Sequence, residues 1–206
     1  MKGRGDMLCI GLTGGSGSGK STVARIFASY GAKTVDTDAV YHSLISAPSA
    51  CVTALSQAFG KEILSACGGI DRKKLAKIVF EPTEVGKERL SLLNEITHRF
   101  VRRECETILA RYKEEGAEMV ILDVPLLFES GFDVICDHTV AVLAPYHVRL
   151  ARIMERDCMD EAAASARLAA QPSDRFYIER ADFTLTNDQD LAGLRQSVAA
   201  LLRGMK

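Results

Sequence analysis

The sequence predicts an α/β protein in which helices cover a parallel sheet, and three observations support this class. Residues 7–13 form a short apolar run that ends in glycines, as a buried parallel strand does. Residues 20–31 place apolar side chains at helical spacing and end on a glycine, and residues 33–36 form a second strand candidate. Strand, tight loop, helix and strand within about thirty residues make a βαβ unit, whose strands are parallel.

The chain after residue 38 alternates between helical and strand patterns. Residues 38–115 are mostly helical in pattern, with apolar residues three and four apart in 71–80 and 88–112. This is more helix than one crossover needs, so we expect a helical insertion at about residues 40–116 within a single domain, residues 1–206. Further strand candidates are 118–123, 138–144 and 182–188, and further helix candidates are 146–157, 160–171 and 191–204.

Composition limits the classes of function. The formal net charge is −1, which provides no general field for nucleic acid or for an anionic membrane, so we expect neither as a partner. No apolar run in the sequence reaches the length of a membrane span, and the first residues lack a signal-peptide pattern. The six cysteines include no C-x-x-C spacing, which disfavours a zinc site, and free thiols predict a cytoplasmic location.

A glycine-rich loop joins the first strand to the first helix. Its pattern Gly14-x-x-x-x-Gly19-Lys20-Ser21 is the Walker A motif. Glycines let successive backbone N–H groups curl around phosphates, and the N-terminus of the following helix adds partial positive charge. Lys20 can reach the β- and γ-phosphates of ATP, and the Ser21 hydroxyl can bind Mg²⁺. A flexible glycine turn is the alternative, which the strand–loop–helix context disfavours. The expected nucleotide-binding residues here are Ser16, Gly17, Ser18, Gly19, Lys20, Ser21 and Thr22.

Carboxylates follow two of the predicted strands. Asp36 and Asp38 come directly after the second strand, and ligands of such sheets bind beyond the carboxyl ends of the strands. One carboxylate can accept the proton of an attacking hydroxyl, while the alternative for either is a helix N-cap. Asp123 ends the apolar run 118–123, the layout of a Walker B carboxylate that helps to hold Mg²⁺. A loop-capping aspartate is the alternative at this position.

Arginines dominate the basic residues near the end of the chain. The stretch from residue 149 to residue 180 contains six arginines and no lysine. Arginine binds phosphate through a bidentate fork, so we interpret about residues 146–181 as a mobile lid that brings arginine charge onto the phosphates. Arg149, Arg152 and Arg156 recur at helical spacing, so at least two of them share a face. The alternative is that several of these arginines pair with neighbouring acids on solvated faces.

With these features in place, the sequence resembles the dephospho-coenzyme A kinase family over nearly its whole length. The D-x-D after the second strand, the VPLLFE segment and the R-x-x-x-R-D of the lid are more specific than the glycine loop alone. The matching segments are IGLTGGSGSGKSTVA, VDTDAV, DRKKLAKIVF, LLNEITH, DVPLLFE, RLARIMERD, RLAAQ with Gln171, and Asn187 after the last strand.

The resemblance implies a P-loop kinase fold, with three α/β/α layers around a five-stranded parallel sheet, a helical coenzyme-binding insertion and an arginine-bearing lid. It also implies transfer of the ATP γ-phosphoryl group to the ribose 3′-hydroxyl of dephospho-coenzyme A. Asp38 would be the base, and Lys20 and Arg152 would stabilise the transferring group. Arg156 would contribute to nucleotide binding, and Asn187 lies where the family has its adenine-side loop.

Four basic side chains of the insertion are candidates for the phosphates of the substrate: Arg72, His98, Arg102 and Arg103. The alternative for each is a surface charge on an amphipathic helix, and His98 could instead be a core-edge histidine bonded to a backbone carbonyl. The sequence departs from the family at three points. Arg99 stands where proline is usual, TNDQD replaces an Asn-x-Gly loop, and Ser16 replaces a bulky aliphatic residue.

Two other classes of protein fit parts of the sequence. Another small-molecule P-loop kinase, acting on a nucleoside or a nucleoside monophosphate, would share the loop, the arginines and the carboxylates and differ in its acceptor. A nucleotide-dependent switch protein is the second, but the sequence lacks the N-K-x-D segment of a GTPase and the basic stripe of a nucleic-acid-dependent ATPase. We expect a monomer or a weak homo-oligomer.

Overall fold

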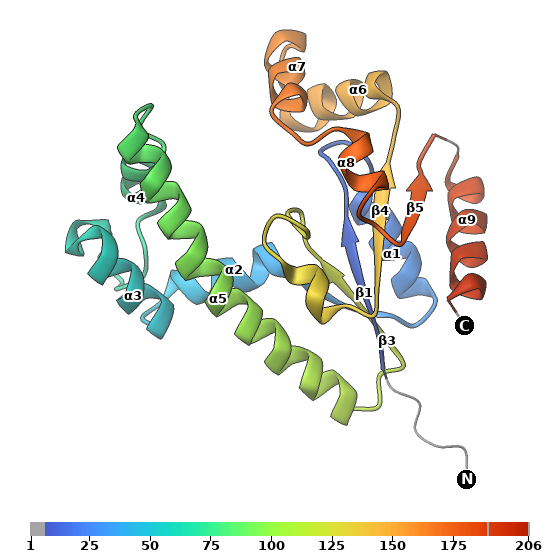
Figure 1. Ribbon diagram of the computed structural model, residues 1–206, viewed down its shortest axis with the longest axis horizontal. Coiled ribbons are helices and arrows are strands. Elements are labelled where there is room, and N and C mark those ends of the chain that lie inside the picture. Colours follow the sequence, from blue (N-terminus) through green and yellow to red (C-terminus); the bar gives the residue numbers. More distant parts are fainter. Residues whose placement is uncertain (1–6, 189, 206) are drawn as a thin grey trace. The chain divides into compact units, whose positions relative to one another are not determined.

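The computed structural model describes residues 7–188 and 190–205. Five strands form one sheet in the order β2-β3-β1-β4-β5 (Figure 1). β1 pairs in parallel with β3 and with β4, and β4 pairs in parallel with β5. The strands are β1 (Leu8–Thr13), β2 (Lys33–Asp36), β3 (Met119–Asp123), β4 (His138–Leu143) and β5 (Phe183–Thr186). The predicted α/β class and five-stranded sheet are therefore confirmed.

The helices connect these strands as a parallel sheet requires. They are α1 (Lys20–Ser29), α2 (Thr37–Ser46), α3 (Ala50–Phe59), α4 (Arg72–Val79), α5 (Glu84–Glu114), α6 (Tyr146–Asp157), α7 (Glu161–Ala169), α8 (Asp174–Ile178) and α9 (Leu191–Gly204), with short 3₁₀ turns at Lys61–Ile63 and Phe132–Ile135. α6 and α9 have the predicted bounds, whereas α8 and the two 3₁₀ turns were not predicted. Such short elements contain too few residues to show a helical period.

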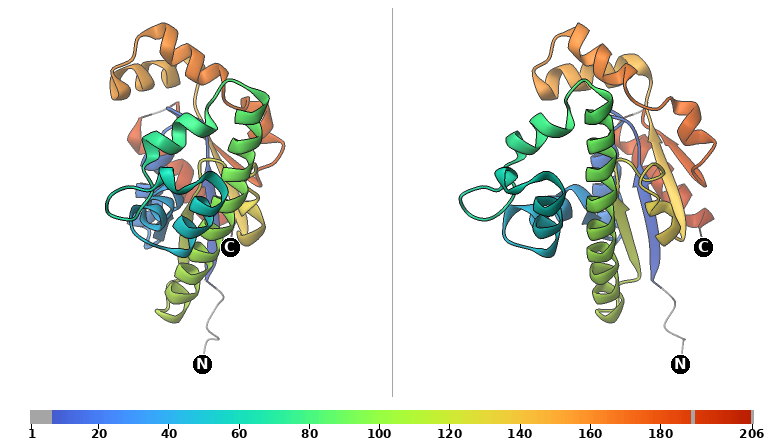
Figure 2. Two further views of the ribbon diagram at one scale, coloured as in Figure 1. Left: turned by 90° about the vertical axis from the view of Figure 1, so that its left-hand side faces the viewer. Right: turned by 60° about the vertical axis from the view of Figure 1, so that its left-hand side comes forward.

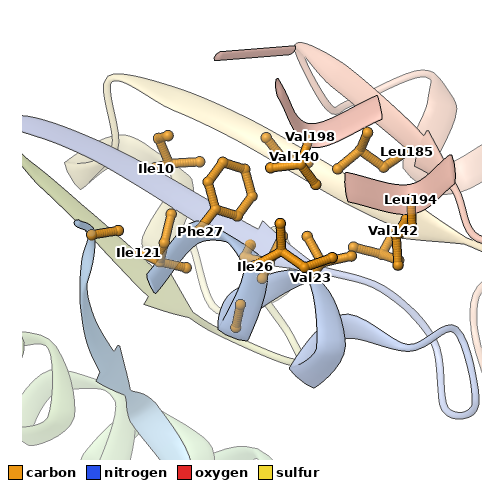
Figure 3. Packing of buried hydrophobic residues seen from close by; sticks show 13 residues of the cluster. Ile10, Val23, Ile26, Phe27, Ile121, Val140, Val142, Leu185, Leu194 and Val198 are labelled. Atoms are coloured by element: carbon orange, nitrogen blue, oxygen red, sulfur yellow. The ribbon is translucent and has the colours of Figure 1, made fainter. Parts of the chain in front are cut away.

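The two faces of the sheet are covered by different elements, which can be followed along β4. Val140 and Val142 point into a cluster with α1 and α9, formed by residues such as Phe27 and Val198 (Figure 3). Ala141 and Leu143 alternate with them and pack with Tyr177 of α8 on the opposite face. This alternation follows from the two-residue period of a strand. The sheet is thus buried on both sides, as its continuous apolar sequence requires.

Helix α1 begins and ends at glycines with left-handed backbone angles. Gly19 is its N-cap residue, with φ of 90°, and Gly31 follows its last turn with φ of 92°. The Ala32 N–H donates to the Phe27 carbonyl over 3.2 Å and the Gly31 N–H donates to the Ala28 carbonyl over 3.0 Å. This pair of bonds satisfies carbonyls at the end of the helix, which is why the predicted stop at Gly31 is confirmed.

Residues Asp36–Arg111 form a compact unit of their own, and the rest of the chain forms a second unit that contains the sheet. The smaller unit, called the inserted unit below, has a separate apolar core that includes Leu55 and Ile63, both fully buried. Its helices begin at side-chain caps, with Ser49 before α3 and Asp71 before α4. Helix α5 starts in this unit, and its last residues belong to the unit with the sheet.

Helices α6 and α7 form an antiparallel pair within the sheet-containing unit (Figure 2). Ile153 of α6 packs against Ala164 and Leu168 of α7, and all three side chains are buried. The chain reverses at Cys158, which has φ of 52° and ends α6. Within the described residues, no helix combines the length and apolar character needed to cross a membrane.

Candidate active site

The glycine-rich loop lies between β1 and α1, and its conformation depends on glycine at two positions. Gly17 has φ of 76°, and a Cβ atom there would lie 2.6 Å from the Arg149 carbonyl oxygen. Gly19 has φ of 90°, and a Cβ atom there would overlap the side-chain amide of Asn187. Both positions combine left-handed angles with a close neighbour, so a side chain would push the loop away from the elements that hold it.

Lys20, at the start of α1, and Asp123, at the end of β3, form an ion pair. Asp123 is the last residue of β3, and the strand register places it beside Leu12, just before the loop. The Lys20 ammonium donates to Asp123 Oδ1, and the two side chains are only 18% and 14% exposed. An ammonium and a carboxylate in this position suit the phosphates and the metal ion of a nucleotide, respectively.

Ser21 and Thr22 lie in the first turn of helix α1, and the Thr22 N–H donates to the Gly19 carbonyl over 2.9 Å. Ser21 is exposed, while the Thr22 hydroxyl accepts a hydrogen bond of 3.2 Å from Arg25. No group of three His, Cys, Asp or Glu side chains within the described part of the chain could hold a metal ion by itself. A Mg²⁺ ion here would therefore take most of its ligands from phosphates and water, which is its usual coordination in such sites.

Arg152 and Asn187 both bind carbonyl groups of the loop. Arg152 Nη1 donates to the Gly17 carbonyl over 3.1 Å and to the Ser18 carbonyl over 3.4 Å. Asn187 is buried, and its Nδ2 donates to the Ser18 carbonyl over 2.8 Å. Its own N–H donates to the Leu143 carbonyl over 2.7 Å, which ties the end of β5 to the end of β4. Two of the predicted site residues therefore lie directly against the loop.

Ser16 and Ser18 of the loop are held in different ways. The Ser16 N–H donates to Gln171 Oε1 over 2.9 Å, so this amide already has a protein partner. The Ser18 hydroxyl is buried and has no hydrogen-bond partner among the described residues. Its oxygen would lie 3.0 Å from a Cβ at Gly14, so the side chain packs beneath the loop. The Ser18 N–H donates to the Gly15 carbonyl over 3.1 Å, so this residue shapes the loop and its N–H already has a protein partner.

Arg156 lies in a separate cluster of charges at the end of α6. Its guanidinium donates to both carboxylate oxygens of Asp157, over 2.8 and 2.7 Å. Arg167 of α7 donates to the same carboxylate over 2.7 Å. These bonds lower the pKa of Asp157 below its ordinary range and raise that of Arg156. The structure thus places Arg156 in a local ion-pair cluster, the arrangement that the sequence offered as an alternative for the lid arginines.

Asp36 and Asp38 have distinct surroundings at the end of β2. Asp36 Oδ1 accepts hydrogen bonds from the N–H groups of Asp38 and Ala39, over 2.9 and 3.2 Å, and so caps helix α2. The helix begins at Thr37, one residue before the helical pattern of residues 38–115. Asp38 lies in the first turn with an exposed side chain that the capping does not use. Capping and proton acceptance can therefore be divided between the two carboxylates.

The basic candidates of the inserted unit lie in two depressions. Arg72 lines an apolar pocket together with Tyr41, whose pKa is raised mainly by burial and partly lowered again by the Arg72 charge. His98 and Arg103 line a groove on α5, together with Glu95, Arg99, Arg102 and Glu106. Burial and then the Arg102 charge lower the pKa of His98, so its imidazole is neutral at pH 7.

Sequence reasoning missed two contributors to the site, Arg149 and Gln171. The sequence predicts Arg149 only as one of the lid arginines, whereas its side chain is buried against the loop. Gln171 was part of a matching segment without an assigned role. Both side chains bind Ser16, which is more than a hundred residues away in the chain, and such a pairing leaves no local pattern in the sequence.

Comparisons with known proteins agree with this geometry. Residues 8–193 match the model of the dephospho-CoA kinase family. A dephospho-CoA kinase of Corynebacterium diphtheriae is 39% identical over 181 residues, which cover 88% of this chain and 88% of that protein. A crystal structure of a Thermus thermophilus protein superposes with a TM-score of 0.79 at 33% identity, covering 98% of this chain and 99% of the other. The dephospho-CoA kinase of Campylobacter jejuni gives 0.60 at 26% identity, with coverages of 96% and 97%. With a phosphate-binding loop, an ion pair at its base and this likeness along the chain, the protein belongs to the dephospho-CoA kinase family.

Proposed function

We propose that this member of the dephospho-CoA kinase family transfers the γ-phosphoryl group of ATP directly to the ribose 3′-hydroxyl of dephospho-CoA, with Asp38 as the general base. The observation that carries the assignment of the base is the division between Asp36 and Asp38. Asp36 is used as the cap of α2, whereas the Asp38 carboxylate is exposed at the carboxyl end of β2. Ligands of parallel sheets bind at this edge.

The nucleotide-binding role is assigned to residues 16–22 with Lys20. Backbone N–H groups of the loop and the N-terminus of α1 bind the phosphates, and the Lys20 ammonium moves its charge from Asp123 to the β- and γ-phosphates. Ser21 and Asp123 would hold Mg²⁺, directly or through water, and the ion would neutralise negative charge on the phosphates.

The transfer step needs one bond to form and one to break. The 3′-hydroxyl oxygen attacks the γ-phosphorus as its proton passes to the Asp38 carboxylate, and the bond to the bridging oxygen of ADP breaks. Lys20 and Arg152 stabilise the charge of the transferring group. Because such a transition state is loose and highly charged, positioning and electrostatics supply most of the acceleration. No phosphoenzyme forms.

Substrate recognition is assigned to the inserted unit and closure to the lid. Arg72, His98 and Arg103 bind the phosphates of dephospho-CoA, with His98 donating as a neutral imidazole. Residues 146–181 act as the lid, and residues 40–116 act as the coenzyme-binding part of one kinase domain. The separate core of residues Asp36–Arg111 supports this division.

The protein is further proposed to act as a monomer or weak homo-oligomer in the cytoplasm. Its six cysteines are free thiols, which suits a reducing compartment. Light scattering on a size-exclusion column across a hundred-fold range of protein concentration tests the oligomeric state. A single stable oligomer at all concentrations would contradict it.

An acceptor panel tests the function. ADP release with ATP and Mg²⁺ is measured with dephospho-CoA, adenosine, cytidine, uridine and nucleoside monophosphates as acceptors, and the CoA product is identified by mass. We expect turnover with dephospho-CoA alone, and a Lys20→Met variant prepared in parallel controls for contaminating kinases. Turnover with a nucleoside or a monophosphate in place of dephospho-CoA would overturn the proposal and favour another small-molecule kinase.

A further inference from the structure

Arg149 carries a charge yet is only 8% exposed, so its guanidinium needs partners for its donors. Nε donates to the Ser16 carbonyl over 3.0 Å, and Nη2 donates to Gln171 Oε1 over 2.7 Å. Nη1 lies 3.3 Å from Asp174 Oδ1, a carboxylate that is half exposed. All three nitrogen atoms of the Arg149 guanidinium therefore have partners, one in the loop, one in the segment after α7 and one in α8.

Gln171 binds the same loop residue from the other side. Its Oε1 accepts from the Ser16 N–H over 2.9 Å, and its Nε2 donates to the Ser16 hydroxyl over 2.8 Å. The donation from Arg149 to Oε1 fixes which end of the Gln171 amide is the oxygen. Ser16 is thus held at its carbonyl, its N–H and its hydroxyl by two side chains from the proposed lid.

The loop is shaped to receive these side chains. A Cβ atom at Gly15 would overlap the Arg149 guanidinium and would lie 2.9 Å from Gln171 Oε1. A Cβ at Gly17 would lie 2.6 Å from the Arg149 carbonyl oxygen. The glycines on both sides of Ser16 therefore serve close approach to Arg149, in addition to any contact with phosphate.

We propose that Arg149 and Gln171 are positioning residues that hold the phosphate-binding loop through Ser16 and so link it to α6 and to the segment after α7. Their polar atoms are used by Ser16, by Asp174 and by each other, so they act on the nucleotide through the loop. The inference rests on the proposed function only for the identity of the nucleotide. Without the hydrogen bonds from Arg149 and Gln171 to Ser16, the nucleotide itself must order the loop when it binds. The entropic cost of this ordering weakens nucleotide affinity.

Five variants test this proposal: Arg149→Met, Gln171→Met, the double variant of these two, Arg149→Lys, and Arg175→Met as a matched control. Arg175 lies in the same proposed lid, in α8, but its side chain is 84% exposed and pairs with Glu179 four residues on. The first readout is the Kd for Mg²⁺–ADP by calorimetry, which needs no acceptor and so stays informative if the acceptor assignment fails. KM values for ATP and dephospho-CoA and the melting temperature are measured as well.

We expect the Kd for Mg²⁺–ADP and the KM for ATP to rise about ten-fold in each single variant, the effect of one lost hydrogen bond to a charged group. The KM for dephospho-CoA should change less than about two-fold, and the double variant should resemble the singles, because both act on Ser16. Arg149→Lys, which keeps the charge and one donor group, should recover part of the affinity. A lower melting temperature with unchanged Kd, a loss equal to that of Arg175→Met, or fully additive effects would overturn the proposal.

Discussion

The sheet-containing unit and the inserted unit hold their functional side chains in opposite ways. Around the glycine-rich loop, polar side chains are buried and bonded to distant parts of the chain, as Asn187 is to Ser18 and Arg149 is to Ser16. In the inserted unit, Asp38, Arg72 and Arg103 are exposed on helices that pack over an apolar core. The first arrangement fixes geometry before a ligand binds, whereas the second leaves side chains free to adapt. We therefore expect substitutions to change loop geometry in one unit and single contacts in the other.

The largest effect is expected for Asp38→Asn, which breaks the proposed division of the two aspartates. Loss of a general base should lower kcat by about 10²–10⁴-fold, with the KM for ATP changed little. Asp36→Asn is the matched control, because asparagine caps a helix as well as aspartate does. Steady-state kinetics with dephospho-CoA measure both. An equal loss of nucleotide affinity in Asp38→Asn would show that this carboxylate binds metal or supports the fold instead.

The next largest effect is expected for Gly11→Ala, which tests how tightly the sheet-containing unit is packed. A Cβ atom at Gly11 would lie 2.8 Å from Cys136 Sγ and 3.1 Å from both Leu127 methyls. Overpacking of this kind should lower the free energy of unfolding by about 1–3 kcal/mol, measured with urea. Gly204→Ala is the control, since nothing lies within 4 Å of its Cβ position. Adding Cys136→Ala to Gly11→Ala should restore part of the loss, and the absence of any recovery would contradict this packing.

A smaller and more selective effect is expected for Arg72→Gln and Arg103→Gln in the inserted unit. Each should raise the KM for dephospho-CoA about ten-fold, since one charge-assisted contact to a phosphate is lost. The KM for ATP should stay constant, which would sharpen the contrast with Arg149→Met. Arg89→Gln is the control on α5, because Arg89 pairs with Glu81 at 3.4 Å and lies outside both depressions. If all three variants have the same KM for dephospho-CoA, then Arg72 and Arg103 are surface charges that do not bind the substrate.

The smallest effect is expected for the pH dependence of stability that His98 causes. Its pKa is lowered by burial and by Arg102, so the unfolded chain, with the ordinary value of 6.5, takes up a proton at a higher pH than the folded protein. Stability should therefore fall as pH decreases through about 6.5, and level off below the lowered pKa. His98→Gln should remove this pH-dependent component of stability, measured by denaturation curves at pH 7.5 and 5.5. If the stability of His98→Gln and of the parent protein depended on pH in the same way, the assignment to His98 would be refuted.

Much of the fold was predictable because periodic patterns extend over whole elements. Helix α6 spans Tyr146–Asp157 as expected, since its apolar residues recur every three or four positions before the reversal at Cys158. Motifs assign Lys20 to the phosphates and Asp123 to the metal ion, and the structure brings the two side chains into contact. The role of Ser16 was not predictable. Its partners are a buried arginine and a glutamine at separations of 133 and 155 residues, and such pairs have no sequence signature without the fold.

The place of the inserted unit in the chain has a consequence for folding. β1 and β3 are neighbours in the sheet, but residues Asp36–Arg111 lie between them in sequence, so pairing these strands must close a long loop. The entropic penalty of closure grows by only about 0.6 kcal/mol for each doubling of loop length, and a segment that collapses early shortens the loop further. The inserted unit can collapse early because its core residues, between Ile45 and Val79, are close in sequence. Substitutions in that core should therefore slow the formation of the sheet, although the core residues themselves contribute no strand to it.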